Sequence, residues 1–323
     1  TIPSPAILLG AGALLVVLGL LAWGRLRPAS GRLPLAALLV AGASGATLPS
    51  HHTPCDVETA YFCASVHEDG PTARILQLDT LYHSEVDLTD DRLLFFEYTQ
   101  AIGGAVDTAW STGRAISALH VGGGGFSMPR YVRATRPGST NLVIERDPAL
   151  IELGKEKLGL RLGNGLTAKA IDGRVALKRE AKASRDLVIG DAFGGEAVPW
   201  HLATREFVTL VRTTLRADGL YALNVIDAGP AKFARAETAT VAKVFRHVAV
   251  VAPAYAFAPS TVGSNYIVLA SQTPMRLDAL RDRYAAMGLD VTVLTGAGLQ
   301  RWVGSAKVLT DAFAPVDQLL TVA

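Results

Sequence analysis

The chain has 323 residues, of which 50% are hydrophobic and 19% charged, and its 31 basic and 29 acidic residues give a net charge of +2. This length suits one large domain or two smaller ones. The apolar content excludes a disordered chain, and the near-zero net charge excludes a broadly basic nucleic-acid binder. The mean hydropathy of +0.28 is high for a soluble enzyme, so the distribution of the apolar residues is informative.

The first 50 residues are apolar, and three arginines are their only charged side chains. Residues 4–23 form an uncharged run of 20 residues, and a helix of that length spans the ~30 Å hydrocarbon core of a bilayer. Residues 33–48 form a second run of 16 residues, which is short for a span. We predict a transmembrane helical hairpin over residues 1–50. The first run could instead be a buried helix or a signal peptide, and the second a re-entrant or signal-peptide-like segment.

All three arginines, Arg25, Arg27 and Arg32, lie between the two runs. Loops rich in Lys and Arg stay in the cytoplasm. If both runs span, the globular body is extracytoplasmic; if only the first spans, the body is cytoplasmic. We predict the first arrangement, in a bacterial cell membrane, with the lipid bilayer as a partner.

The chain has two cysteines, Cys55 and Cys63, which follow shortly after the second run. Such a close pair favours a small-loop disulfide in an oxidising compartment, with two reduced structural thiols as the alternative. His51, His52 and His67 lie nearby, but the spacing matches no zinc motif. We therefore predict a Cys55–Cys63 disulfide and no metal site.

The rest of the chain alternates strand-like and helix-like segments. Residues 59–88 have a strand pattern with a turn at 68–71, which predicts a small antiparallel β unit within residues 51–98. From residue 99 to 323 the pattern is typical of βαβ units. Helices are predicted from Pro148 and over 202–216, the latter ended by residues 217–219. Strands are predicted at 116–122, 141–147, 167–172, 186–192, 219–227, 247–254 and 265–271, the last of which could be antiparallel.

Chemistry-bearing residues gather where these strands end. Gly122, Gly123, Gly124 and Gly125 stand between a strand and a helix, where glycines let backbone N–H groups approach a ligand. Three acids end the next three strands: Glu145, suited to ribose hydroxyls, Asp172, suited to the adenine amine, and Asp191. Together they predict a nucleoside pocket. A dinucleotide is less well supported, because no glycine completes the GxGxxG spacing.

From about residue 74 to 271 the sequence resembles the spermidine synthase family, within the class I S-adenosylmethionine-dependent transferase fold. LDTLYHSEVDLTDDRLLFFEY is similar to the segment that joins the family's β domain to its Rossmann-like domain, with Tyr98 at the family's tyrosine. VGGGGF resembles its GGGDGG turn, IERD its ExD, and IDGR its D/N-G-A. DLVIGDAF followed by HLATREF resembles DVIxxD…LxTxEF, through Asp191, Leu202, Thr204, Glu206 and Phe207. The apolar head and cysteine pair further resemble the family's bacterial membrane-fused branch.

The resemblance implies an α/β fold, a Rossmann-like doubly wound sheet of class I methyltransferase type. It also implies an S-adenosylmethionine-type nucleoside held by Gly122, Gly123, Gly124, Glu145, Asp172 and Asp191. Two positions depart from the family, which has aspartates where this chain has Gly125 and Gly194. In the family these carboxylates bind the polyamine and help to deprotonate its amine. The family's glutamine is matched by His83, and Glu85, Asp87, Glu97 or Glu196 could substitute for the lost acids.

Two functions follow as alternatives. The chain could be a membrane-anchored, catalytically inactive or altered binding module, part of a membrane assembly or a homo-oligomer. It could instead be an active aminopropyltransferase or methyltransferase that uses (decarboxylated) S-adenosylmethionine, with Asp191, Tyr98 and His83 as catalytic candidates. For His83 and His201 the pattern favours hydrogen-bonded structural histidines over acid or base groups. No nucleic-acid partner is predicted.

Overall fold

The computed structural model describes residues 55–195, 197–258 and 261–321. The two apolar runs at 4–23 and 33–48, on which the predicted membrane hairpin rests, lie outside these residues, as does Glu196. Within the described residues, no helix combines the length and the apolar character that crossing a membrane requires.

The chain divides into two compact units, with the boundary between Ala64 and Ser65, inside a strand. In the described part of the first unit, β1 (Val57–Glu58) pairs antiparallel with the first two residues of β2 (Cys63–Asp69). Cys55 and Cys63 form a disulfide with a Cα–Cα distance of 5.5 Å. The predicted cysteine pairing is therefore confirmed.

The second unit begins with a small β sheet. After β2 come β3 (Ala73–Leu78) and β4 (Leu81–Asp87), which pair antiparallel with an irregularity between Leu76 and Gln77. The turn before β3 includes Gly70 at φ +78°, a conformation that glycine adopts without strain. The structure thus contains the small antiparallel unit that the sequence predicted.

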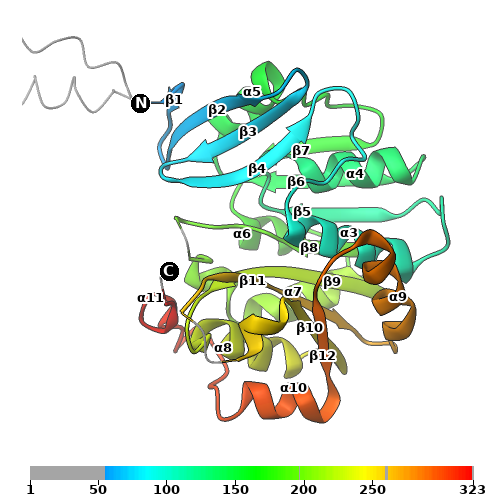
Figure 1. Ribbon diagram of the computed structural model, residues 1–323, viewed down its shortest axis with the longest axis vertical. Helices are drawn as coiled ribbons and strands as arrows, with labels where there is room; N and C mark the ends of the chain where they lie inside the picture. Colours follow the sequence, from blue (N-terminus) through cyan, green and yellow to red (C-terminus); the bar gives the residue numbers. More distant parts are fainter. Residues whose placement is uncertain (1–54, 196, 259–260, 322–323) are drawn as a thin grey trace, which may run out of the picture. The chain divides into compact units, whose positions relative to one another are not determined.

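An eight-stranded sheet forms the centre of the second unit, in the order β12-β10-β11-β9-β8-β5-β6-β7 (Figure 1). The five strands from β7 to β9 are parallel, whereas β11 is antiparallel to both β9 and β10, and β12 is antiparallel to β10. The strands are β5 (Ser117–Val121), β6 (Thr140–Glu145), β7 (Leu166–Ala170), β8 (Arg185–Gly190), β9 (Leu215–Asp227), β10 (His247–Ala252), β11 (Ser264–Ser271) and β12 (Thr292–Thr295).

This order is that of a doubly wound Rossmann-like sheet of the class I methyltransferase type, as predicted, with β12 as an extra edge strand. From β5 the chain adds β6 and β7 on one side and then β8 and β9 on the other, so the strand order reverses between β5 and β8. Ligands of open α/β sheets bind at the carboxyl ends of the strands beside such a switch point. The expected antiparallel pairing of the last strands is confirmed.

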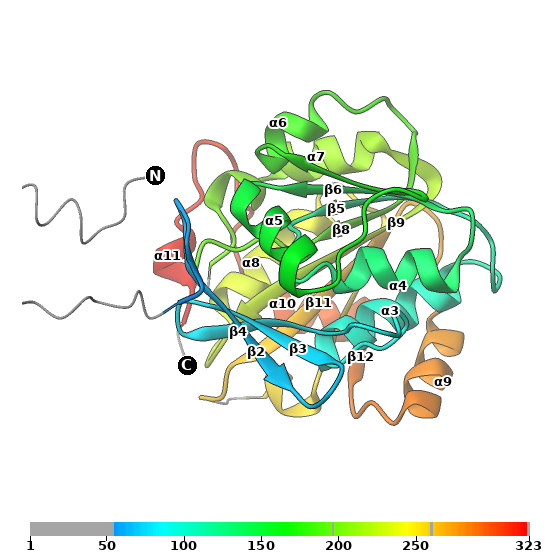
Figure 2. The same cartoon turned by 90° about the horizontal axis from the view of Figure 1, so that it is seen from above.

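Helices cover both faces of the large sheet (Figure 2). One face packs against α3 (Glu97–Ala109), α4 (Ser127–Thr135) and α9 (Leu277–Met287). The other packs against α6 (Gly173–Leu177), α7 (Arg205–Thr214), α8 (Lys232–Ala242) and α10 (Gly296–Val303). The remaining helical elements are α5 (Pro148–Lys157), which begins at the predicted Pro148, and the shorter η1 (Trp200–Leu202), η2 (Ala254–Phe257) and α11 (Val316–Leu319).

The helix predicted over 202–216 is wrong at both ends. It begins only at Arg205, because the Thr204 side chain accepts from the Phe207 N–H and caps α7 there. It ends at Thr214, and β9 starts directly at Leu215, so that residues 217–219 lie inside a strand and are no helix stop. The pairing of β9 with β8 is irregular at this point, where Leu215 faces Arg185 but Leu220 faces Leu187.

Candidate functional site

The glycine turn joins β5 to α4 at the switch point. Gly122 has φ +102°, and a Cβ there would run into the carbonyl group of Asp191, whose carbon would be 2.6 Å away. The Gly122 N–H donates to the Ile144 carbonyl (2.9 Å), and the Asp191 N–H donates to the Val121 carbonyl (2.8 Å). The turn is therefore in backbone contact with the ends of both neighbouring strands.

Glu145, the predicted ribose carboxylate, ends β6 and is buried beside this turn. Its Oε2 accepts from the Gly123 N–H and its Oε1 from the Asp147 N–H, both at 2.8 Å. Burial raises the pKa of the Glu145 carboxyl, against the effect of these hydrogen bonds. Because each carboxylate oxygen can accept more than one hydrogen bond, capacity for two hydroxyl donors remains.

Asp172, the predicted adenine carboxylate, follows β7 and caps α6. Its Oδ1 accepts from the N–H groups of Arg174 and Val175, both at 3.0 Å. Its Oδ2 lies 2.7 Å from Nε2 of His201. Burial opposes ionisation, but the hydrogen bonds from Val175 and His201 outweigh it and lower the pKa of Asp172. The protein itself thus already engages both oxygens, and His201 is a hydrogen-bonded partner of Asp172.

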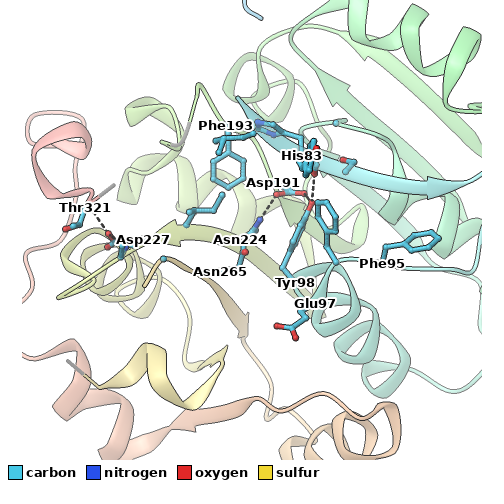
Figure 3. A pocket seen from close by; sticks show the side chains of 18 residues that line it. His83, Phe95, Glu97, Tyr98, Asp191, Phe193, Asn224, Asp227, Asn265 and Thr321 are labelled. Carbon is cyan, nitrogen blue, oxygen red and sulfur yellow. Dashed lines mark hydrogen bonds between the residues drawn. The ribbon is translucent and has the colours of Figure 1, made fainter. Parts of the chain in front are cut away.

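Asp191, the first catalytic candidate, follows β8 and belongs to a chain of side-chain hydrogen bonds (Figure 3). Its Oδ1 accepts from Asn224 Nδ2 (2.9 Å) and its Oδ2 from the Tyr98 hydroxyl (3.3 Å). Asn265 Nδ2 donates in turn to Asn224 Oδ1 (2.9 Å). Burial raises the pKa of Asp191 to about 6, although the hydrogen bonds from Asn224 and Tyr98 favour the charged form.

The same residues line a pocket of about 590 Å³ within the second unit, large enough for a small molecule. Tyr98 and His83, the other catalytic candidates, also line it, so the structure brings all three together. Burial is the main cause that raises the pKa of the Tyr98 hydroxyl and lowers that of His83, which favours the neutral form of both. Further lining residues are Leu81, Tyr82, Ser84, Phe95, Phe96, Glu97, Gly124, Phe193, Asn224, Ile226, Asp227, Ala228, Gly263, Asn265 and Thr321.

Two residues of this pocket, Asn224 and Asn265, are not among those predicted from the sequence. Asn224 stands in the run YALNVID, where a lone amide interrupts an otherwise apolar buried strand. A buried amide needs hydrogen-bond partners, so a lone Asn in that strand could have indicated a polar side-chain cluster at this point of the sheet. Nothing local marks Asn265, which gains its role because β11 pairs with β9 and sets Asn265 opposite Ile226.

The two positions that depart from the family differ in their surroundings. At Gly125 a Cβ would be 2.5 Å from the Cβ of Ser84, and the Gly125 N–H donates to Ser84 Oγ (2.9 Å). At Gly194 the nearest atom to an added Cβ is Pro199 Cγ at 4.0 Å. Ser84 thus fills the space of one missing carboxylate, whereas the space of the other is open.

The suggested substitutes for these acids are placed differently. Glu97 lines the pocket, whereas Glu85 and Asp87 are not among its lining residues. Asp87 accepts hydrogen bonds from the hydroxyls of Thr72 and Thr89, both at 2.6 Å, and these bonds hold its pKa well below the usual range. Asp87 therefore stabilises the loop that follows β4.

Comparisons with known proteins agree with this fold. No family model matches the chain. The chain is 25% identical to a polyamine aminopropyltransferase of Vibrio vulnificus over 213 residues, which cover 62% of this chain and 69% of that protein. A solved structure of a probable spermidine synthase from Corynebacterium glutamicum superposes with a TM-score of 0.73 at 25% identity, covering 80% of this chain and 97% of that one.

A spermidine synthase solved in complex with the transition-state analogue AdoDATO is more distant. It superposes with a TM-score of 0.52 at 13% identity and covers 83% of both chains. At that identity the likeness concerns the fold alone. Taken together, the sheet order and these relatives show that the chain is similar to spermidine synthases and has their class I methyltransferase-like fold.

Proposed function

We propose that this chain is a membrane-anchored, spermidine-synthase-like protein with a retained S-adenosyl-nucleoside pocket and an altered acceptor pocket that does not use an ordinary polyamine. The observation that carries the proposal is the contact between Ser84 and Gly125. Because Ser84 fills the space next to Gly125, the family's aspartate cannot be accommodated there without displacing β4.

We call the glycine turn, Glu145 and Asp172 the nucleoside half of the site, and the pocket around Asp191 the acceptor half. The residues of the nucleoside half fit an S-adenosylmethionine-type ligand. Glu145 lies at the end of β6 with unused acceptor capacity, and it is fixed by two backbone N–H donors. Gly122 and Gly123 keep the turn free of side chains beside it. Glu145 would accept from the ribose hydroxyls, and Asp172 from the adenine amine if His201 shares its Oδ2.

The first test of this proposal is binding of the nucleoside. Titration calorimetry with S-adenosylmethionine, its decarboxylated form and methylthioadenosine is expected to give a measurable affinity for at least one of them. A failure of all three to bind at millimolar concentration would remove the nucleoside pocket. Aminopropyl transfer to putrescine, measured on the same preparation, is expected to be absent, and turnover would contradict the altered acceptor pocket.

A second candidate function, an active transferase, is favoured by one specific observation. Asp191 has its pKa raised to about 6 and is aligned by Tyr98 and Asn224, which suits a general base near neutral pH. When bound, an S-adenosyl nucleoside supplies a carbon activated by its sulfonium, which departs as a thioether. Asp191 would take the proton that an acceptor amine loses as its nitrogen bonds to that carbon. Product formation with an amine other than a polyamine would favour this candidate.

The membrane location rests on the composition of residues 1–50 and on the Cys55–Cys63 disulfide, which suits an oxidising, extracytoplasmic compartment. The proposed partners are the bilayer and either a membrane complex or further copies of this chain. Maleimide labelling of intact cells tests the topology. We expect Cys55 and Cys63 to react only after an impermeant reductant is added, and rapid labelling without reductant would contradict the extracytoplasmic disulfide.

A further inference from the structure

The pocket around Asp191 has an unusual distribution of charge. Three acids line it: Glu97, Asp191 and Asp227. Asp227 is 1% exposed, and its two oxygens accept from four backbone N–H groups, those of Ala228, Phe233, Ala234 and Thr321. Asp227 is therefore already satisfied by the backbone and has no need of a ligand's positive charge.

Glu97 is exposed in the first turn of α3, and its carboxylate points away from Asp191 in Figure 3. Water therefore solvates Glu97, and an ion pair there would contribute little to binding. Among the described residues that line this pocket, none is Lys or Arg. In the inner part of the pocket, Asp191 is thus the carboxylate that keeps free acceptor positions for a ligand.

Asp191 has capacity for one more partner. Its Oδ1 and Oδ2 each accept one hydrogen bond, from Asn224 and Tyr98, and a carboxylate can accept about four. The two remaining positions suit the N–H groups of an ammonium, which would form a charge-assisted pair in surroundings with little water.

Much of the remaining wall is aromatic or aliphatic. Figure 3 shows Phe193 and Tyr98 on either side of Asp191. Phe95, Phe96 and Tyr82 add further aromatic surface, and Leu81 and Ile226 add aliphatic surface. Such walls favour an apolar ligand body, and aromatic faces also attract an organic cation.

Among the described lining residues, a second ammonium would find no buried carboxylate with a free acceptor position, because Asp227 already accepts four backbone N–H groups. The family's two aspartate positions are Gly125, where Ser84 fills the space, and Gly194, where the space is open but holds no charge. A diamine would thus have to bury its second charge against apolar side chains or leave it in water.

We infer that this pocket takes a monoamine, with its single ammonium against Asp191 and its apolar body along the aromatic wall, in preference to an aliphatic diamine. The inference rests on the altered acceptor half of the proposed function and names the ligand class of that half. The nucleoside half is not needed for it.

Titration calorimetry at pH 8 with 2-phenylethylamine and 1,4-diaminobutane tests the inference. We expect phenylethylamine to bind at least about tenfold more tightly, because its one charge is paired and its ring is buried. Equal or tighter binding of diaminobutane overturns the inference, and so does a failure of phenylethylamine to bind at millimolar concentration.

Two matched variants locate the ammonium. Asp191→Asn is expected to weaken phenylethylamine binding at least about tenfold, because the ion pair is lost while the size is kept. Glu97→Gln makes the same change on the same pocket and is expected to alter the affinity less than about twofold. If Glu97→Gln has the larger effect, the ammonium is not at Asp191 and the inference is wrong.

Methylthioadenosine is titrated into the same preparation without amine, so that the two proposals fail separately. Loss of nucleoside binding would contradict the proposed function and leave the amine ranking intact. A diamine preference with normal nucleoside binding would contradict the monoamine inference, and the separate assay of aminopropyl transfer to 1,4-diaminobutane (putrescine) would then decide on the altered acceptor pocket. Circular dichroism of each variant confirms that a lost affinity is not a lost fold.

Discussion

The two halves of the site hold their carboxylates by different means. In the nucleoside half, the N–H groups of Gly123 and Asp147 bind Glu145. Those of Arg174 and Val175 bind one oxygen of Asp172, whose other oxygen contacts the His201 side chain. In the acceptor half, side chains of two further elements, Tyr98 of α3 and Asn224 of β9, bind Asp191. Backbone donors are fixed by the fold, whereas side-chain donors change with single substitutions. The comparison therefore explains how one half could keep the family's pattern while the other diverged.

The largest effect is expected at the turn that joins the two halves. Gly122→Ala would place a Cβ against the Asp191 carbonyl at φ +102°, so we expect unfolding to become easier by about 3 kcal/mol or more. Gly194→Ala is the matched control, because its Cβ would meet no atom closer than 4.0 Å, and it should stay within about 0.5 kcal/mol. Denaturant unfolding measures both. Similar values for the two variants would show that the turn is not constrained as described.

Glu145→Gln separates the halves by function. The amide NH₂ would face one of the two N–H donors that Glu145 now accepts from, at a cost of about 2 kcal/mol. We expect methylthioadenosine to bind about thirtyfold more weakly, while phenylethylamine binding stays the same. Calorimetry with both ligands measures the split. An equal loss of both would mean that the halves are not independent.

Gly194→Asp tests the comparison from the acceptor side. The open space there would accept a second carboxylate, and we expect diaminobutane to bind about tenfold more tightly. Gly194→Asn is the neutral control and should give no gain.

Gly125→Asp should instead destabilise the fold by about 2 kcal/mol, since its Cβ would be 2.5 Å from that of Ser84. Ser84→Gly in the same chain is expected to relieve that cost, and a Gly125→Asp variant as stable as the parent would contradict the contact.

The sequence predicted the parallel part of the sheet well, because buried strands such as β5, β6 and β8 are largely apolar runs that end in, or are directly followed by, Gly or an acid. It missed β12, whose four residues are all half-buried at the edge of the sheet, and the helices α3, α8, α9 and α10. In α3 the run EYTQAIGGAVDTA has two glycines and small residues, which weaken a helical pattern. Gly103 and Gly104 are needed there because Leu94 and Tyr284 pack directly against them.

The site was predictable only where chain order places residues together. Glu145, Asp172 and Asp191 follow successive parallel strands, so their meeting at one sheet edge could be inferred. Pairings across the fold, such as Ser84 with Gly125 and Asn265 with Asn224, depend on how β4 approaches the turn and on the register of β11. No local pattern encodes those contacts, and they determine what the acceptor half can bind.

A change of pH is expected to affect the acceptor half through Asp191. Asp191 is charged above its pKa of about 6 and neutral below it, so its ion pair with an amine forms at higher pH and is lost as the pH falls. Between pH 7 and 5.5 we expect phenylethylamine affinity to fall about fourfold. In Asp191→Asn this dependence should disappear, and any that remains reports His83, which lines the same pocket. Unchanged affinity in the parent chain would contradict the raised pKa.

The smallest effect concerns His201, which competes for the nucleoside half. Its Nε2 lies 2.7 Å from Asp172 Oδ2, the oxygen on which an adenine amine would have to bind. Replacing His201 with Ala frees that oxygen, so we expect methylthioadenosine to bind about threefold more tightly, a gain of a fraction of one hydrogen bond. Methylthioinosine lacks the exocyclic amine and should gain nothing, whereas His201→Gln can keep a donor near Asp172 and should resemble the parent chain. If both nucleosides gain equally from His201→Ala, the variant has only widened the site, and Asp172 does not bind the amine.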